Sequence, residues 1–199
     1  MERVYKLVMI GLVGAFILNG CAKAPTQEIN DTKAQVEAVT NTDTQTYAAD
    51  ELSKLNSDLT AALDEVNLQN DKFLFKKYDN AKVMLANVKT AAENVKTVAA
   101  QRKEEAKNKA ITAQGEAQVA IDAAKALLEK APTGKGTKAD IEMFKADLTG
   151  IEESFAALQG TIDAEKYSDA LNSANIIKEK AASISNEITL AIEKVKGRR

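Results

Sequence analysis

The sequence predicts an all-α protein, an elongated antiparallel helical bundle of coiled-coil-like hairpins, in which two tandem helical units are joined by a long helix. Alanine accounts for 34 of the 199 residues and only two prolines interrupt the chain, a composition that favours helices. Beyond residue 27, apolar residues recur at spacings of three and four, the seam of left-handed helix packing. The chain also matches itself at an offset of 89 residues, which indicates two copies of one unit.

The segment before the predicted bundle has a different character. Arg3 and Lys6 precede an apolar stretch of 12 residues, 7–18, which ends in Leu18-Asn19-Gly20-Cys21. A transmembrane helix needs about 20 apolar residues, so this stretch is too short to be one. The pattern resembles the lipobox signal peptide of bacterial lipoproteins. The resemblance implies that residues 1–20 are removed by cleavage between Gly20 and Cys21, and that a lipid such as palmitate is attached to Cys21.

The residues after the cysteine bear on location. Ala22 follows Cys21, whereas in enteric-type lipoproteins an aspartate at that position favours retention in the inner membrane. The resemblance therefore implies a lipid anchor in the outer membrane, with the protein facing the periplasm. Residues 21–27 are expected to form the lipidated cysteine and a tether of at most about 20 Å. Since Cys21 is the only cysteine, no internal disulfide is expected.

The first helical unit is expected at 28–110, after the tether. Polar clusters at 41–44 and 67–71 interrupt the apolar seam and predict turns. Between these turns the pattern predicts three helices, at about 27–40, 48–66 and 72–100.

The second helical unit is expected at 111–199. Its turns are predicted at 132–136, where a proline and two glycines fall close together, and at Gly160. Thr137 or Asp140 is expected to cap the middle helix, and Asp163 the last one. The predicted helices lie at about 113–130, 138–159 and 163–196.

Residues 72–130 link the two units and contain one glycine, Gly115, and no proline. They have the composition for a single helix of about 59 residues, roughly 88 Å long. Residues 101–109 are polar nearly all round, so they form either an exposed helical bridge or a bend. We favour the continuous bridge.

The internal repeat extends without a gap from Leu52 onward. Asp58-Leu59-Thr60 matches Asp147-Leu148-Thr149, and Lys77-Tyr78 matches Lys166-Tyr167 with an alanine three residues further on in both copies. Lys89 likewise matches Lys178. Chance periodicity would imitate the apolar seam, but not these identities in one register, so we interpret the pattern as an internal duplication.

Composition excludes several function classes. Without residues 1–20 the chain has 25 basic and 28 acidic residues, a net charge of about −3, so nucleic-acid binding is not expected. The chain has no histidine, which excludes imidazole metal ligands and histidine-dependent catalytic triads, and it lacks a P-loop or dinucleotide motif. Adjacent carboxylates do not face each other on a helix, so the paired acids are interpreted as solvated faces: Glu104-Glu105, Glu152-Glu153 and Asp64-Glu65. No catalytic residue, metal ligand or cofactor other than the covalent lipid is predicted, and the protein is not expected to be an enzyme.

Two further features have a structural and a functional interpretation. Residues 106–131 form a seam of small side chains, either packed within the second unit or used for self-association; we favour internal packing. The aromatic residues near the hairpin turns either fill the core there or line pockets, and we favour core filling with the tyrosine hydroxyls reaching polar groups. These residues are Phe73, Phe75, Tyr78, Phe144, Phe155 and Tyr167.

Tyr47-Ala48-Ala49-Asp50-Glu51-Leu52, the helix at 52–66 and Lys77-Tyr78-Asp79-Asn80-Ala81 resemble small Ala-rich helical envelope lipoproteins of a domain-of-unknown-function family. That family often starts with Tyr-Ala-Pro-x-x-Leu, and Ala49 stands here in place of the proline. Some members carry an added peptidoglycan-binding domain of the OmpA type, but the resemblance transfers no binding residues to this chain.

The leading hypothesis is a structural or protein-interaction role for a protein that its lipid holds to a membrane. The expected partner is an envelope protein or the cell wall, bound non-covalently, with self-association as a further option and no nucleic acid. The chain ends in Arg199, so the covalent peptidoglycan linkage that Braun-type lipoproteins make through a terminal lysine is not expected. The alternative function is a carrier or binding module for a lipid or other apolar ligand between the helices.

Overall fold

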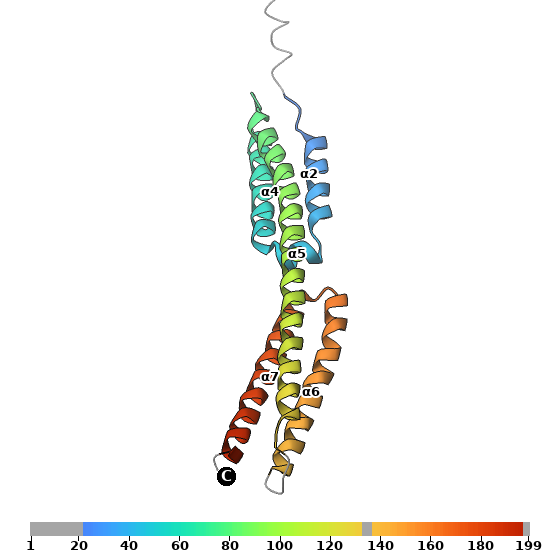
Figure 1. The fold of residues 1–199 in the computed structure, drawn as a ribbon. Helices are drawn as coiled ribbons and strands as arrows, with labels where there is room; N and C mark the ends of the chain where they lie inside the picture. The colour runs from blue at the N-terminus through green and yellow to red at the C-terminus, as the bar shows by residue number, and fades with distance from the viewer. Residues whose placement is uncertain (1–21, 133–136, 197–199) are drawn as a thin grey trace, which may run out of the picture. The chain divides into compact units, whose positions relative to one another are not determined.

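The computed structural model describes residues 22–132 and 137–196. All regular structure in these residues is helical, which confirms the all-α prediction (Figure 1). The helices are α2 (Thr26–Val39), α3 (Thr42–Tyr47), α4 (Ala49–Asn70), α5 (Asp79–Glu129), α6 (Lys138–Asp163) and α7 (Tyr167–Lys196).

The chain divides into two compact units. Unit 1 ends at Arg102 and unit 2 begins at Lys103, so the division falls inside α5, eight residues before the boundary that the sequence predicts. Unit 1 consists of α2, α3, α4 and the first part of α5. Unit 2 consists of the rest of α5 together with α6 and α7. One helix therefore serves both units.

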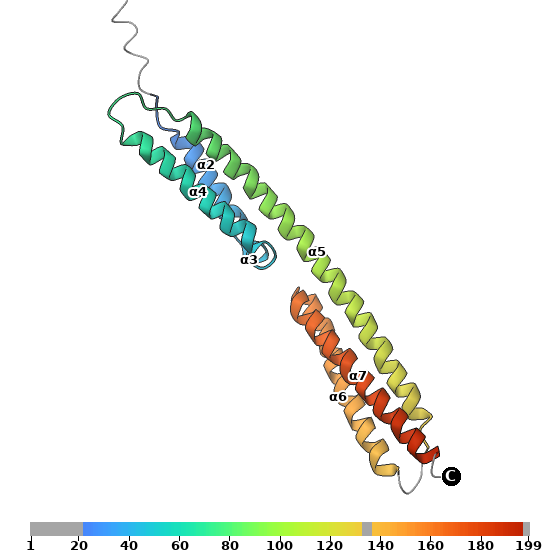
Figure 2. The same ribbon diagram turned by 90° about the vertical axis from the view of Figure 1, so that its left-hand side faces the viewer.

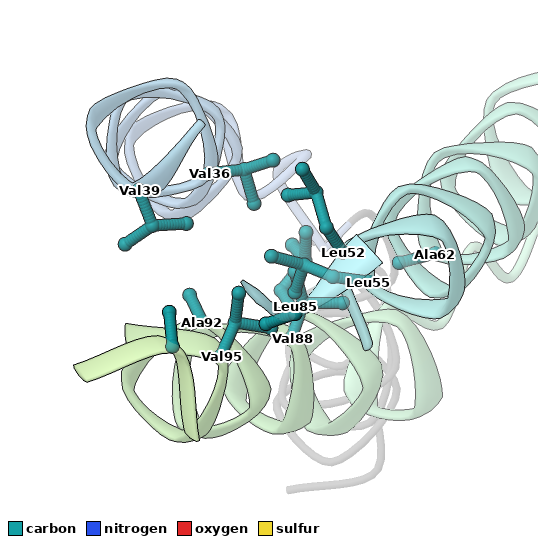
Figure 3. Close-up of a cluster of buried hydrophobic side chains, with 11 residues drawn as sticks. Val36, Val39, Leu52, Leu55, Ala62, Leu85, Val88, Ala92 and Val95 are labelled. Atoms are coloured by element: carbon teal, nitrogen blue, oxygen red, sulfur yellow. The ribbon is translucent and has the colours of Figure 1, made fainter. Parts of the chain in front are cut away.

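The core of unit 1 lies between α2, α4 and α5. Small and aliphatic side chains fill it, because the sequence offers few aromatic residues. Figure 3 shows side chains from these three helices converging: Val36 and Val39 from α2, Leu52, Leu55 and Ala62 from α4, and Leu85, Val88, Ala92 and Val95 from α5.

The turn after α2 contains a short helix that the sequence pattern does not predict. Asn41 and Thr44 form a capping box: the Asn41 side chain accepts from the Thr44 N–H at 3.1 Å, and the Thr44 hydroxyl accepts from the Asn41 N–H at 3.0 Å. This reciprocal pair satisfies donors that would otherwise lack partners. The predicted turn at 41–44 is thus the start of α3.

In unit 2, α6 packs along α7 and both lie beside the second part of α5 (Figures 1 and 2). Along α5, Ala110, Ala113, Ala117 and Ala124 are buried. The small-residue seam is therefore used for packing within unit 2, as favoured from the sequence. Larger side chains on α6 and α7, such as Phe144 and Ile177, are also buried in unit 2.

The long helix α5 is continuous from Asp79 to Glu129, a length of 51 residues, which confirms the uninterrupted bridge. Residues 101–109 within it are exposed or half-buried. The predicted start at residue 72 is wrong, because residues 72–78 form a loop and the helix begins seven residues later.

Other helix ends also differ from the prediction. Helix α4 runs four residues beyond 66, to Asn70. Helix α6 passes through Gly160 and ends at Asp163, so Asp163 does not cap the last helix, which begins at Tyr167. The space around Gly160 is open, because a Cβ added there would meet nothing within 4 Å. A glycine inside a helix costs only about 1 kcal/mol relative to alanine, which is too little to end the helix at this position.

The duplication is visible in the packing. At the offset of 89, α4 corresponds to the start of α6, and buried Tyr78 corresponds to buried Tyr167. The first helix of each unit follows an offset of 85 instead: Val36 and Val39 in α2 correspond to Ile121 and Ala124 in α5, all four buried. From the equivalent buried residues, Val39 and Ala124, the start of the second helix is therefore four residues further along the chain in unit 2 than in unit 1.

An ion pair repeats in the same way. Lys89 lies 4.0 Å from Asp31 in unit 1, and Lys178 lies 2.7 Å from Glu116 in unit 2. The lysines are 89 residues apart and the acids 85. Both units therefore join their first and third helices through an equivalent surface contact.

Candidate functional site

The predicted lipidation site, Gly20 and Cys21, lies outside the described residues. Ala24, three residues beyond Cys21, packs on a small cluster made by Val66, Tyr78 and Ala81. Helix α2 begins at Thr26 rather than after residue 27. The chain is thus held against unit 1 almost from the cysteine onward, and Cys21 lies at most about 10 Å of extended chain from Ala24.

The loop at 71–78, called the tip loop here, joins α4 to α5 at the end of unit 1 where α2 begins (Figure 2). The side chains of Phe73, Leu74 and Phe75 are 91%, 57% and 74% exposed. The expectation that Phe73 and Phe75 fill the core is therefore wrong. Because the helix starts only at Asp79, these residues have no helix face with which to reach the core.

The remaining hairpin aromatics behave as favoured. Tyr78 and Tyr167 are buried, and the Tyr78 hydroxyl donates to the Asn70 side-chain oxygen at 2.6 Å. Phe144 is buried and Phe155 half-buried in unit 2. Core filling is therefore confirmed for Tyr78, Phe144 and Tyr167, and in part for Phe155.

A groove of about 760 Å³ runs between α6 and α7 within unit 2. On α6 it is lined mainly by small side chains between Ala146 and Ala157, together with Asp147. On α7 it is lined by serines, isoleucines and Lys180, and Ile176 among them is 52% exposed. The α6 side spans three helical turns, about 17 Å. The sequence analysis missed this groove, although the wide small-residue face of Ala146, Gly150, Ser154 and Ala157 was its signal.

The paired acids lie on the surface. Glu104 is exposed and 3.9 Å from Lys107, Glu152 pairs with Lys125, and Glu65 accepts from the Gln69 side-chain amide at 2.9 Å. Their neighbours Glu105, Glu153 and Asp64 are exposed. In each pair, one carboxylate therefore has a lysine or amide partner and the other faces solvent. In no pair do the two carboxylates face one cleft.

One ion pair in unit 1, between Arg102 and Glu51, lowers the pKa of its carboxylate. Arg102 donates to both carboxylate oxygens of Glu51, at 3.0 and 2.7 Å, and to the Tyr47 carbonyl at 3.0 Å. These charge-assisted bonds hold the pKa of Glu51 below its ordinary value of 4.5. In unit 2, the hydrogen bond to Glu152 raises the pKa of Lys125 above its ordinary value. Both carboxylates belong to structural ion pairs between helices.

Across the described residues, every buried side-chain polar atom has a hydrogen-bond partner, and no group of three or more acidic or cysteine side chains is arranged to hold a metal ion. None of the helices between residues 22 and 196 is both long and apolar enough to span a membrane.

Comparison of the chain with protein-family models, curated proteins and solved structures finds no match.

Proposed function

We propose that the protein is a lipoprotein of the cell envelope, anchored through Cys21, with a structural or protein-interaction role and no catalysis. The anchor is supported by the lipobox pattern, with its basic start, short apolar stretch and Gly20-Cys21 junction. The localisation that we propose is the outer membrane, facing the periplasm.

The interaction role is supported by one observation above the others, the open groove between α6 and α7. Its length of about three turns and its floor of small side chains suit the apolar face of a partner helix, which docks through residues spaced three and four apart. The occupant that we propose is an amphipathic helix of an envelope protein, bound non-covalently.

The test is photo-crosslinking in cells with a photoreactive amino acid at position 176, inside the groove. The matched control carries it at position 119, on α5, where Val119 is 69% exposed and lines no part of the groove. The proposal predicts one envelope protein crosslinked at 176 and not at 119, in the lipidated protein and not in Cys21→Ser. Equal crosslinking at both positions, or none at 176, would contradict it.

The same groove supports a second candidate, a carrier for a lipid or other apolar ligand. Its volume falls within the range of about 300–1,000 Å³ typical of ligand pockets. Solvent extraction of protein purified from membranes separates the two functions, since a carrier retains a stoichiometric apolar guest in addition to the lipid on Cys21. An Ile176→Glu variant that loses this guest would establish the carrier role.

A further inference from the structure

The tip loop exposes apolar side chains because its local contacts in unit 1 hold them outward. Several hydrogen bonds tie the loop to Gln69 and Asn70 at the end of α4, including one from Lys72 Nζ to Gln69 Oε1 at 2.9 Å. The Lys77 N–H donates to Gln69 Oε1 at 3.1 Å, the Tyr78 hydroxyl donates to Asn70 Oδ1 at 2.6 Å, and Lys76 Nζ donates to the Asn70 carbonyl at 2.6 Å.

The backbone at Phe75 shows the same constraint. Its φ is +59°, in the left-handed region, which a bulky L-residue adopts only when its surroundings require it. The loop therefore holds Phe73 and Phe75 outward instead of letting them fold back on the core.

Unit 2 provides an internal comparison. At the offset of 89, Phe73 corresponds to Ile162, which is 8% exposed because α6 continues to Asp163. The connection there is only residues 164–166, Ala-Glu-Lys. The same hairpin thus closes without an apolar loop in one copy, so exposing Phe-Leu-Phe is a property of unit 1 and not a requirement of the fold.

The tip loop lies beside Ala24, which follows the proposed lipidation site by three residues. Ala24 packs on Val66, Tyr78 and Ala81, the residues at the base of the loop. Glu28 in the first turn of α2 also lies 3.8 Å from Lys82, just after the loop. A lipid on Cys21, at most about 10 Å of chain from Ala24, brings this end of unit 1 to a bilayer surface.

The charges around the loop favour an anionic surface. Lys72, Lys76 and Lys77 flank the three apolar residues, and Lys23 is exposed near the start of α2. Lys82 is a fifth lysine at this end, and the acids there are Glu28, Asp71 and Asp79, so the lysines exceed the acids by two. Apolar side chains with a basic border are typical of segments that enter the interface of anionic membranes.

We propose that the tip loop is a second membrane-binding site, in which Phe73, Leu74 and Phe75 insert into the interface of the anionic bilayer that holds the lipid on Cys21. The inference rests on the proposed lipid anchor. Contact at both the lipid and the loop restricts the orientation of unit 1 relative to the bilayer, which the lipid alone leaves free.

The test exploits the absence of tryptophan from the chain. Lipidated Phe73→Trp protein is purified from membranes and reconstituted into phosphatidylethanolamine/phosphatidylglycerol vesicles that contain phospholipids brominated on their acyl chains. Lipidated Val119→Trp, with a similarly exposed position in unit 2, is the matched control. Flotation of the vesicles reports the lipid anchor, and quenching by bromine reports insertion of the loop.

The proposal predicts that both proteins float, and that only the tryptophan at position 73 shows a blue shift and bromine quenching. Replacing phosphatidylglycerol by phosphatidylcholine should weaken that quenching, because the lysines lose their anionic partners. Flotation with equal, solvent-like emission at both positions would overturn the inference and leave the anchor intact. Failure of both proteins to float would overturn the anchor and the inference with it.

A second variant guards against a local effect of tryptophan. Phe73→Gln/Phe75→Asn removes the apolar side chains without touching the core, and asparagine tolerates the positive φ at position 75 better than phenylalanine. In the Cys21→Ser protein this change should lower binding to anionic vesicles about tenfold or more, because two buried phenylalanines contribute more than one factor of ten. Unchanged binding would contradict insertion.

Discussion

Exchanging a large and a small core residue between α4 and α5 should reveal that the cores of the two units are built from equivalent layers. Val66 and Ala81 belong to the same cluster. Counting four residues back along α4 and four forward along α5 pairs Ala62 with Leu85, both buried. The corresponding pair in unit 2 is Ile151 with Ala174, also buried. The large side chain lies on α5 in unit 1 and on α6 in unit 2, so the layer contains one large and one small side chain in both units.

The expected magnitudes follow from that layer. Leu85→Ala alone should destabilise unit 1 by about 2–5 kcal/mol, because it leaves a cavity. Ala62→Ile alone should cost about 1–3 kcal/mol through overpacking. The double variant recreates the arrangement of unit 2 and should lose less than about 1.5 kcal/mol, as volume-conserving exchanges do. The coupling energy should therefore be at least about 1.5 kcal/mol.

Native-state hydrogen exchange, read by mass spectrometry on peptides from α4, measures the stability of unit 1 itself. A single global unfolding curve of a chain with two units does not separate the stability of one unit from that of the other. The matched control combines Ala62→Ile with Val95→Ala, ten residues and about 15 Å further along α5 than Leu85. That pair should be additive within about 0.5 kcal/mol. A coupling energy below about 0.5 kcal/mol for Ala62 and Leu85 would refute the shared layer.

Three further predictions concern packing, charge and helix propensity. Ala124→Leu, at a fully buried position of the small-residue seam, should destabilise unit 2 by about 1–3 kcal/mol in thermal unfolding, whereas Ala123→Leu on the exposed side should change it by less than about 0.5 kcal/mol; equal effects would argue against internal packing of the seam. Arg102 lowers the pKa of Glu51 in the folded state, so the contribution of Glu51 to folding stability is present above the ordinary pKa of 4.5 and is lost as the pH falls through the lowered value. The difference in Tm between the protein and its Glu51→Gln variant should therefore shrink from pH 7 to pH 3. A constant difference would contradict the ion pair. Gly160→Ala should raise Tm, with a gain of up to about 1 kcal/mol, because the Cβ enters open space inside a helix; a lower Tm would show that the helix is strained at that position.

The period of the apolar residues carried most of the fold prediction. Spacings of three and four specify which face of each helix is buried, and residues on that face, such as Leu55, Val88 and Ile177, are buried in the structure. The repeated Lys-Tyr and Asp-Leu-Thr motifs exposed the duplication. The offset of 85 in the first helix could not be found in this way. Val36 and Val39 share only their apolar character with Ile121 and Ala124, and no sequence motif is common to the two segments.

The helix ends and the tip loop required information that periodicity lacks. Phe73 and Phe75 are apolar and lie near the next seam, so their chemistry predicted a buried helical start. The structure differs because the side chains of Gln69 and Asn70 bind loop groups and fix a non-helical path. The groove between α6 and α7 depends on how two helices diverge in space, which follows from packing rather than from either sequence segment alone.

The proposed lipid on Cys21 would hold the protein at a membrane, and the mass of the amino-terminal peptide of the protein purified from its native membranes tests this directly. A lipid anchor predicts a chain that begins at Cys21 and carries the added mass of acyl groups on that residue. An amino-terminal peptide that still contains residues 1–20, or an unmodified Cys21 in the mature protein, would contradict it.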